Sequence, residues 1–210
     1  MQNFMVPFYE TFDHTWSLGQ LPKVSEVLFV VKDEKIKQIC KDVISSFETQ
    51  VLQKRNTFRK ALIHGDLNEH NLLIDTDSSS NSGFRISGLL DFQDSTLSYP
   101  LYDIAICICY MLMTGKSEVP QEDLPGYMLA GYNSIVELPP AEKPALRACI
   151  AGRMVMSLVY GAYTYHLDPT NEYVLDTAKF GWKALTQFWE ADPEKLLDRW
   201  DEIIQKYHSK

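Results

Sequence analysis

The stretch that decides the fold reads Ile63-His64-Gly65-Asp66-Leu67-Asn68-Glu69-His70-Asn71-Leu72-Leu73-Ile74. It is a polar loop between two short apolar runs, residues 61–63 and 72–74, whose length and composition are typical of strands. Asp66 and Asn71 stand five residues apart on this loop. Strands are therefore expected to hold the loop at both ends.

A second carboxylate follows the next apolar run. After a Ser-, Asp- and Asn-rich loop, residues 84–90 form another strand candidate, which leads into Asp91-Phe92. Kinases have the same order of features: a strand, His-x-Asp, an Asn five residues after that Asp, a second strand, a loop, a third strand and Asp-Phe. There, one Asp accepts the proton of the acceptor hydroxyl, and the Asn and second Asp hold Mg²⁺ at the nucleotide phosphates. The pattern predicts Asp66 as the base, and Asn71 and Asp91 as ligands of Mg²⁺ and nucleotide.

Other interpretations of the same residues compete with this one. The His-Gly-Asp turn alone is as often structural, and Asp91 alone could be an ordinary carboxylate at a strand end, so only the joint pattern is specific. A metallohydrolase that uses His64, Asp66 and His70 is a different class of enzyme. No second cluster of histidines accompanies these residues, because the others are far apart in the sequence.

The rest of the chain is predicted to be mainly helical. Residues 33–53 repeat apolar side chains at helical spacing. Further helices are expected near 104–113, 124–136, 141–166, 173–190 and 193–207, and the one at 141–166 is apolar on nearly every side, as a buried central helix would be. The first thirty residues suggest an irregular connecting segment. The expected fold class is α+β, mostly α, with a small β platform that carries the loop and a helical bundle.

The composition limits the classes of function. The 210 residues are 45% hydrophobic and 23% charged, as in globular domains, with a net charge of −8. This balance argues against a nucleic-acid partner, but a metal ion could still bring a nucleotide. The four cysteines have no C-x-x-C spacing, which favours reduced, buried thiols. No signal peptide is recognisable and the longest apolar run is about half a membrane span, so a cytoplasmic protein without a membrane partner is expected.

The loop and the end of the second strand resemble a known family. His64 to Asn71, the run Leu89-Leu90-Asp91-Phe92-Gln93-Asp94 and Asp103 before a helix are similar to the aminoglycoside phosphotransferase superfamily of protein-kinase-like small-molecule kinases. Weaker similarities near Trp16 and Trp182 resemble its hydroxylysine kinase branch. The resemblance implies a transferase that moves the γ-phosphoryl group of GTP or ATP to the hydroxyl of 5-hydroxylysine or a related small amino alcohol.

The resemblance also implies a role for each matching residue. Asp66 would be the catalytic base, and Asn71 and Asp91 would hold Mg²⁺. His64 would brace the loop, and Asp103 would tie it to the helical core.

Residues that could bind the acceptor are less specific. A site for hydroxylysine needs acidic residues near the base to face its ammonium groups, for which Asp94 and Glu69 are candidates, and a basic residue further out to face its carboxylate, for which Arg153 is one. Gln93 departs from the Gly that usually follows Asp-Phe, where Gly gives the backbone freedom.

The sequence also lacks parts that kinases carry. It has no Gly-x-Gly and no Val-Ala-Ile-Lys-like strand before the loop. The chain is therefore expected to be a protein-kinase-like C-terminal lobe without the N-terminal lobe, with residues 1–32 as the inter-lobe connection and 33–210 as the lobe. Impaired activity is expected. The alternative is a catalytically inactive remnant that acts as a binding or interaction module, and an exposed apolar inter-lobe face could let it self-associate.

Overall fold

The structure is a computed structural model, which describes residues 14–80, 82–115 and 117–209. Helices dominate it and two small sheets complete it, which confirms the α+β, mostly α class. The strands are β1 (Ala61–Ile63), β2 (Leu72–Thr76), β3 (Phe84–Leu89) and β4 (Thr96–Ser98). The helices are η1 (Leu18–Val30), α2 (Glu34–Phe47), η2 (Glu48–Leu52), η3 (Arg55–Thr57), η4 (Glu69–Asn71), α3 (Pro100–Met113), α4 (Leu124–Asn133), α5 (Lys143–Leu167), η5 (Glu172–Leu175), α6 (Ala178–Glu190) and α7 (Pro193–His208).

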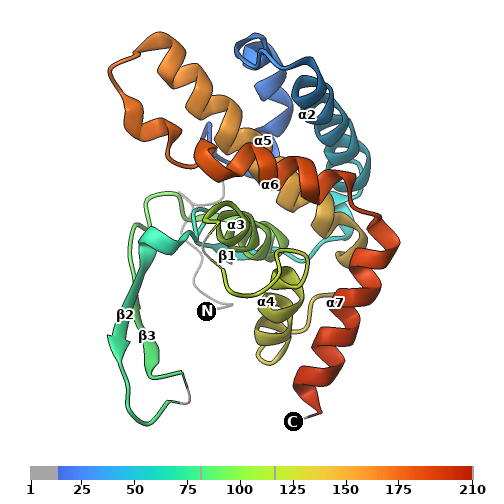
Figure 1. Cartoon of the computed structure of the whole chain (residues 1–210). Helices are drawn as coiled ribbons and strands as arrows, with labels where there is room; N and C mark the ends of the chain where they lie inside the picture. Colours follow the sequence, from blue (N-terminus) through green and yellow to red (C-terminus); the bar gives the residue numbers. More distant parts are fainter. Residues whose placement is uncertain (1–13, 81, 116, 210) are drawn as a thin grey trace.

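Helix α5 is the centre of the helical body, as the sequence predicts. It packs against η1, α2, α3 and α6 (Figure 1), and fifteen of its residues are buried. Such a helix buries apolar side chains on every side because neighbours surround it. Within the described residues it is also the one helix long and apolar enough to cross a membrane, but 78% of its most apolar window is buried inside the fold. The apolar character of α5 is therefore explained by its place in the core.

The expectation of an irregular N-terminal segment is wrong for residues 18–30. They form η1, a 3₁₀ helix that lies along α5. Leu18, Leu21 and Val24 are buried at intervals of three residues, which matches the three residues per turn of a 3₁₀ helix. Because these side chains share the core of α5, they help to position the helix from which Arg153 reaches the loop. The domain boundary at residue 32 stays a prediction.

Two antiparallel strand pairs carry the loop. β2 pairs with β3, which confirms the predicted hairpin, and β1 pairs with β4. No sequence pattern indicates β4, because Thr-Leu-Ser is short and has no clear alternation. β1 lies against α3, whereas the β2–β3 hairpin projects from the helical body (Figure 1).

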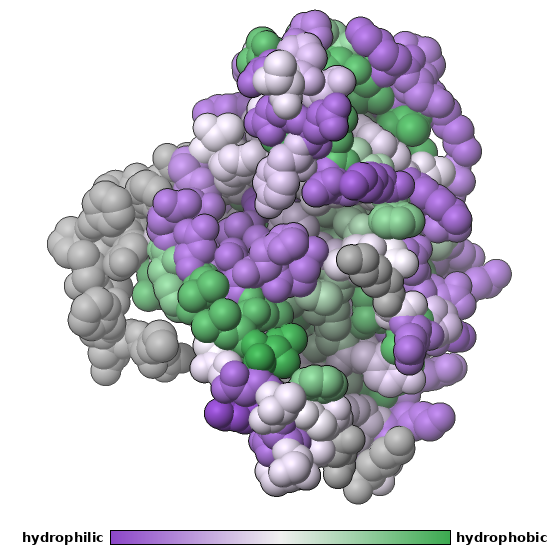
Figure 2. Space-filling view, turned by 60° about the vertical axis from the view of Figure 1, so that its left-hand side comes forward, coloured by the Kyte–Doolittle hydropathy of each residue, from purple (hydrophilic) through white to green (hydrophobic). Residues whose placement is uncertain are grey.

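The hairpin exposes an apolar surface. Figure 2 views the face from which the hairpin projects and shows apolar side chains gathered there. On the hairpin, the exposed large apolar side chains are Leu73, Ile74, Phe84, Ile86 and Leu89. Surfaces of this kind usually meet another protein surface.

Candidate active site

The first turn of α3 holds the start of the loop between β1 and β2. The backbone N–H groups of His64 and Gly65 donate to the two carboxylate oxygens of Asp103, over 2.8 and 2.9 Å. Burial raises the pKa of Asp103, and these two hydrogen bonds oppose the rise. Gly65 has a φ of +87°, and a Cβ there would collide with the backbone of Asp94. Only glycine suits this position, and Asp103 ties the loop to the helical core as the resemblance implies.

His64 joins the loop to the end of β3. Its Nε2 lies 2.8 Å from the carbonyl oxygen of Leu90, and its Nδ1 accepts a hydrogen bond from the backbone N–H of Asp66 over 3.3 Å. The two contacts together require a neutral ring with the proton on Nε2. The ring also contacts that of Phe92, with 4.9 Å between centroids. His64 therefore has the bracing position expected of it.

The Asp66 carboxylate is held from two sides. Its Oδ1 accepts from the guanidinium of Arg153 over 2.6 Å. Its Oδ2 accepts from the side-chain amide of Asn68 over 2.9 Å and from that of Asn71 over 3.4 Å. Asn71 also donates to the backbone carbonyl of Asp66 over 2.9 Å. The structure thus brings two of the predicted site residues, Asp66 and Asn71, into direct contact.

Arg153 has a different place from the one expected. It is 1% exposed and also donates to the backbone carbonyl of Trp16 and the hydroxyl of Tyr110, over 2.8 and 3.1 Å. A guanidinium so enclosed is not available to the carboxylate of an acceptor, which corrects the hypothesis from the sequence. The sequence could not reveal its contact with Asp66, because the two residues are 87 positions apart and meet only through the packing of α5.

The charges of Asp91 and Asp94 act on the carboxylate of Asp66. Burial raises the pKa of Asp66, Arg153 opposes that rise, and the charges of Asp94 and Asp91 add to it. Asp91 is exposed and has a φ of +59°, a left-handed conformation that Asp tolerates better than most residues. Gln93 does not have a positive φ, so no glycine is required there.

The donor set suits Mg²⁺. The side-chain nitrogen of Asn71 is hydrogen-bonded to Asp66, which leaves the amide oxygen of Asn71 as a possible metal ligand. Asp91 offers an exposed carboxylate as a second one. No three His, Cys, Asp or Glu side chains in the described ranges gather closely enough to hold a metal by themselves. Mg²⁺ does not require such a cluster, because it binds through one or two protein oxygens together with water and substrate phosphates.

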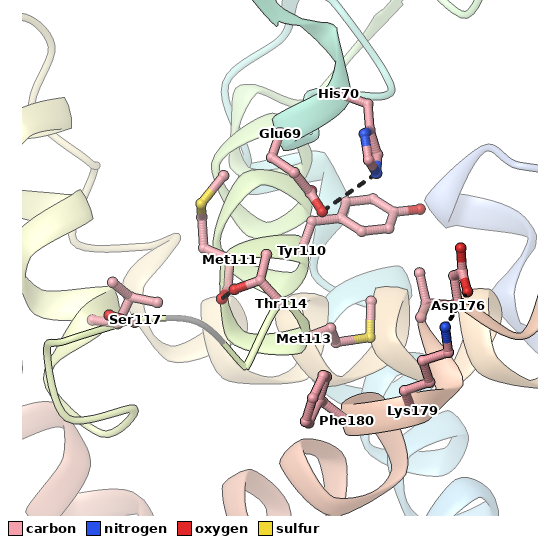
Figure 3. Close-up of a pocket in the computed structure, with 12 residues that line it drawn as sticks. Glu69, His70, Tyr110, Met111, Met113, Thr114, Ser117, Asp176, Lys179 and Phe180 are labelled. Atoms are coloured by element: carbon pink, nitrogen blue, oxygen red, sulfur yellow. Dashed lines mark hydrogen bonds and ion pairs between the residues drawn. The ribbon is translucent and has the colours of Figure 1, made fainter. Parts of the chain in front are cut away.

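A cavity of about 670 Å³ opens beside the loop (Figure 3). Its walls come from η4, from α3, from the segment after α3 and from the start of α6. The lining residues are Glu69, His70, Tyr110, Met111, Met113, Thr114, Ser117, Leu124, Asp176, Thr177, Lys179 and Phe180. The cavity thus combines an apolar floor with charged groups on opposite walls.

Comparison with known protein families shows the family to which the chain belongs. Residues 20–138 match the phosphotransferase enzyme family (APH), and because this is more than half of the chain, the chain belongs to that family. The matched region contains the loop, both strand pairs and α3.

The individual relatives are more specific. The chain is similar to hydroxylysine kinase from Xenopus laevis, with 35% identity over 213 residues that cover 98% of this chain and 56% of the relative. It is also similar to hydroxylysine kinase from Bos taurus, with 34% identity over 197 residues that cover 92% and 52%. The chain spans about half the length of the curated relatives it matches.

Proposed function

We propose that the chain is the C-terminal, catalytic-loop lobe of a small-molecule kinase that transfers the γ-phosphoryl group of GTP or ATP to the hydroxyl of 5-hydroxylysine or a related amino alcohol. The observation that carries this proposal is the contact of Asp66 with Asn71 on a loop that Asp103 holds at its start. Phosphoryl transfer depends mainly on positioning and electrostatics, and a loop fixed in this way supplies the positioning. The family and the named relatives support the choice of reaction and acceptor.

Asp66 is the proposed catalytic base. A pKa raised above that of an ordinary Asp, mainly by burial, makes its carboxylate a better acceptor for the proton of the attacking hydroxyl. Arg153 fixes Oδ1, and Asn68 fixes Oδ2, so the carboxylate keeps one orientation. Asn71 and Asp91 are the proposed ligands of Mg²⁺ and, through it, of the nucleotide. The ion, when bound, would neutralise charge on the transferring phosphates.

A second candidate is an inactive lobe that acts as a binding module. It is favoured by the Asp66 carboxylate, both of whose oxygens already accept hydrogen bonds from Arg153, Asn68 and Asn71. The exposed apolar hairpin offers such a module a surface, including one for self-association. For the chain alone we propose weak or no turnover, cytoplasmic location, and no nucleic-acid or membrane partner.

A transfer assay separates these candidates. Purified chain is incubated with Mg²⁺-GTP or Mg²⁺-ATP and 5-hydroxylysine, and phosphorylated product is measured beside Asp66→Ala. Slow transfer that Asp66→Ala abolishes supports an impaired kinase, and its complete absence supports the binding module. Fast transfer that Asp66→Ala abolishes would refute impairment. Transfer that survives Asp66→Ala would refute the base assignment.

A further inference from the structure

We propose that the cavity beside the loop binds the aminoalkyl end of the acceptor and that the Glu69 carboxylate takes its ammonium group. The inference rests on the proposed function and deepens it, because it gives the acceptor an orientation. All the residues that carry it belong to the described part of this chain.

One carboxylate oxygen of Glu69 lacks a hydrogen-bond donor among the described residues. Its Oε2 is buried and has no hydrogen-bond partner among the described residues. Its Oε1 is 3.7 Å from Nε2 of His70, which is too long for a hydrogen bond and leaves only a charge interaction when His70 is protonated. In Figure 3 the carboxylate of Glu69 lies over the cavity beside the ring of Tyr110. A carboxylate in such a position lowers its free energy by gaining a charged donor, and a primary ammonium group supplies three.

The position of Glu69 relative to Asp66 suits an amino alcohol. The two residues are three positions apart on one loop, and Tyr110, which lines the cavity, shares the Nη2 of Arg153 with the Asp66 carboxylate. In 5-hydroxylysine, the carbon that bears the ammonium is the neighbour of the carbon that bears the hydroxyl. Groups that recognise this pair must therefore lie close together, and a separation of three positions on one loop suits Asp66 and Glu69 to that task.

The rest of the cavity suits the other end of an amino acid. Met113 and Phe180 provide apolar surface for methylene groups. Across the cavity from Glu69, Lys179 and Asp176 form an ion pair of 2.7 Å and offer one charge of each sign (Figure 3). A zwitterionic α-amino acid head carries the complementary pair of charges. The cavity thus favours an acceptor with an ammonium near its hydroxyl and an amino acid head beyond it.

Calorimetric titration of the purified full chain tests the inference without nucleotide or turnover. The ligands are 5-hydroxylysine and 2-amino-5-hydroxyhexanoic acid, which has the same carbon chain with a hydrogen atom in place of the ε-ammonium group. Glu69→Gln keeps the shape of the side chain and removes its charge, and Glu48→Gln, at an exposed site outside the cavity, is the matched control. Circular dichroism and the thermal midpoint verify that each variant is folded.

We expect Glu69→Gln to weaken binding of 5-hydroxylysine at least tenfold, because a charge-assisted hydrogen bond is lost. Binding of 2-amino-5-hydroxyhexanoic acid should change less than twofold, and Glu48→Gln should change neither. The inference is overturned if the wild-type chain does not bind 5-hydroxylysine, or if Glu69→Gln leaves that binding unchanged or weakens both ligands equally.

This outcome is separable from that of the transfer assay. Binding that depends on Glu69 without any phosphoryl transfer would support the cavity and favour the binding module over the impaired kinase. Transfer that depends on Asp66 but is indifferent to Glu69→Gln would support the function and refute the cavity assignment.

Discussion

The loop between β1 and β2 and the β2–β3 hairpin are neighbours in sequence, yet they are held in opposite ways. The loop is fixed from outside by Asp103 of α3 and by the buried Arg153 of α5. The hairpin depends on its own strand pairing, and Ile74 and Ile86, which face each other across it, are 62% and 64% exposed. A two-stranded hairpin alone is marginally stable in water. This chain therefore holds the loop with its own helices, whereas no surface among the described residues covers the hairpin.

Substitution of one arginine in each region is expected to give the largest difference in the free energy of unfolding. Arg153→Met leaves the partly buried carboxylate of Asp66 without its ion-pair partner and should lower the free energy of unfolding by about 3–5 kcal/mol. Arg85→Met removes the exposed ion pair with Asp75 on the hairpin and should cost about 0–1 kcal/mol. Urea denaturation of both variants measures the difference. Equal losses would mean that the loop is no more firmly held than the hairpin.

Substitution of one glycine in each region is expected to give the next largest difference in the free energy of unfolding. Both have a positive φ, +87° at Gly65 in the loop and +75° at Gly83 in the hairpin turn, but only Gly65 has a neighbour in the way of a side chain. Gly83→Ala should cost about 1–2 kcal/mol for the left-handed backbone alone. Gly65→Ala adds a clash and should cost about 2–5 kcal/mol in total. The same denaturation experiment checks this order, and a reversed order would contradict the packing of the loop against Asp94.

The anchor at Asp103 makes the stability of the loop depend on pH. Burial raises the pKa of Asp103 in the folded chain, so the stability that this group contributes is complete below its unfolded pKa of about 4 and declines as the pH rises through the folded value. The advantage of the native chain over Asp103→Asn should therefore be largest near pH 4 and smaller at pH 7. Unfolding measured at both pH values tests this, and an advantage that grows toward pH 7 would contradict it.

The smallest effect on stability is expected at the hairpin surface. Ile86→Thr keeps a β-branched side chain on an exposed strand position and should change the free energy of unfolding by no more than about 0.5 kcal/mol. If the hairpin face mediates self-association, sedimentation should show less of it in this variant. A loss well above that size in a monomeric sample would mean that Ile86 is packed within the chain.

The sequence predicts those parts of the molecule whose signals are local. The loop, the hairpin and the central helix follow from runs and periods of a few residues, and Asp66 and Asn71 are close in space because they are close in the sequence. η1 was missed because its apolar residues recur every three positions, between the periods usual for helices and strands. The contact of Arg153 with Asp66 is not predictable from the sequence, because it depends on how α5 packs and no local pattern contains that packing.

We propose that the loop between β1 and β2 holds the base and, together with Asp91 after β3, the metal ligands of a phosphotransferase, and a chimera tests this most directly. In the chimera, this chain replaces the matching part of the Bos taurus hydroxylysine kinase, and transfer from Mg²⁺-GTP to 5-hydroxylysine is measured. We predict measurable turnover, which Asp66→Ala lowers about 10²–10⁴-fold, as removal of a general base does. A folded chimera without turnover, or one whose turnover survives Asp66→Ala, would contradict the claim.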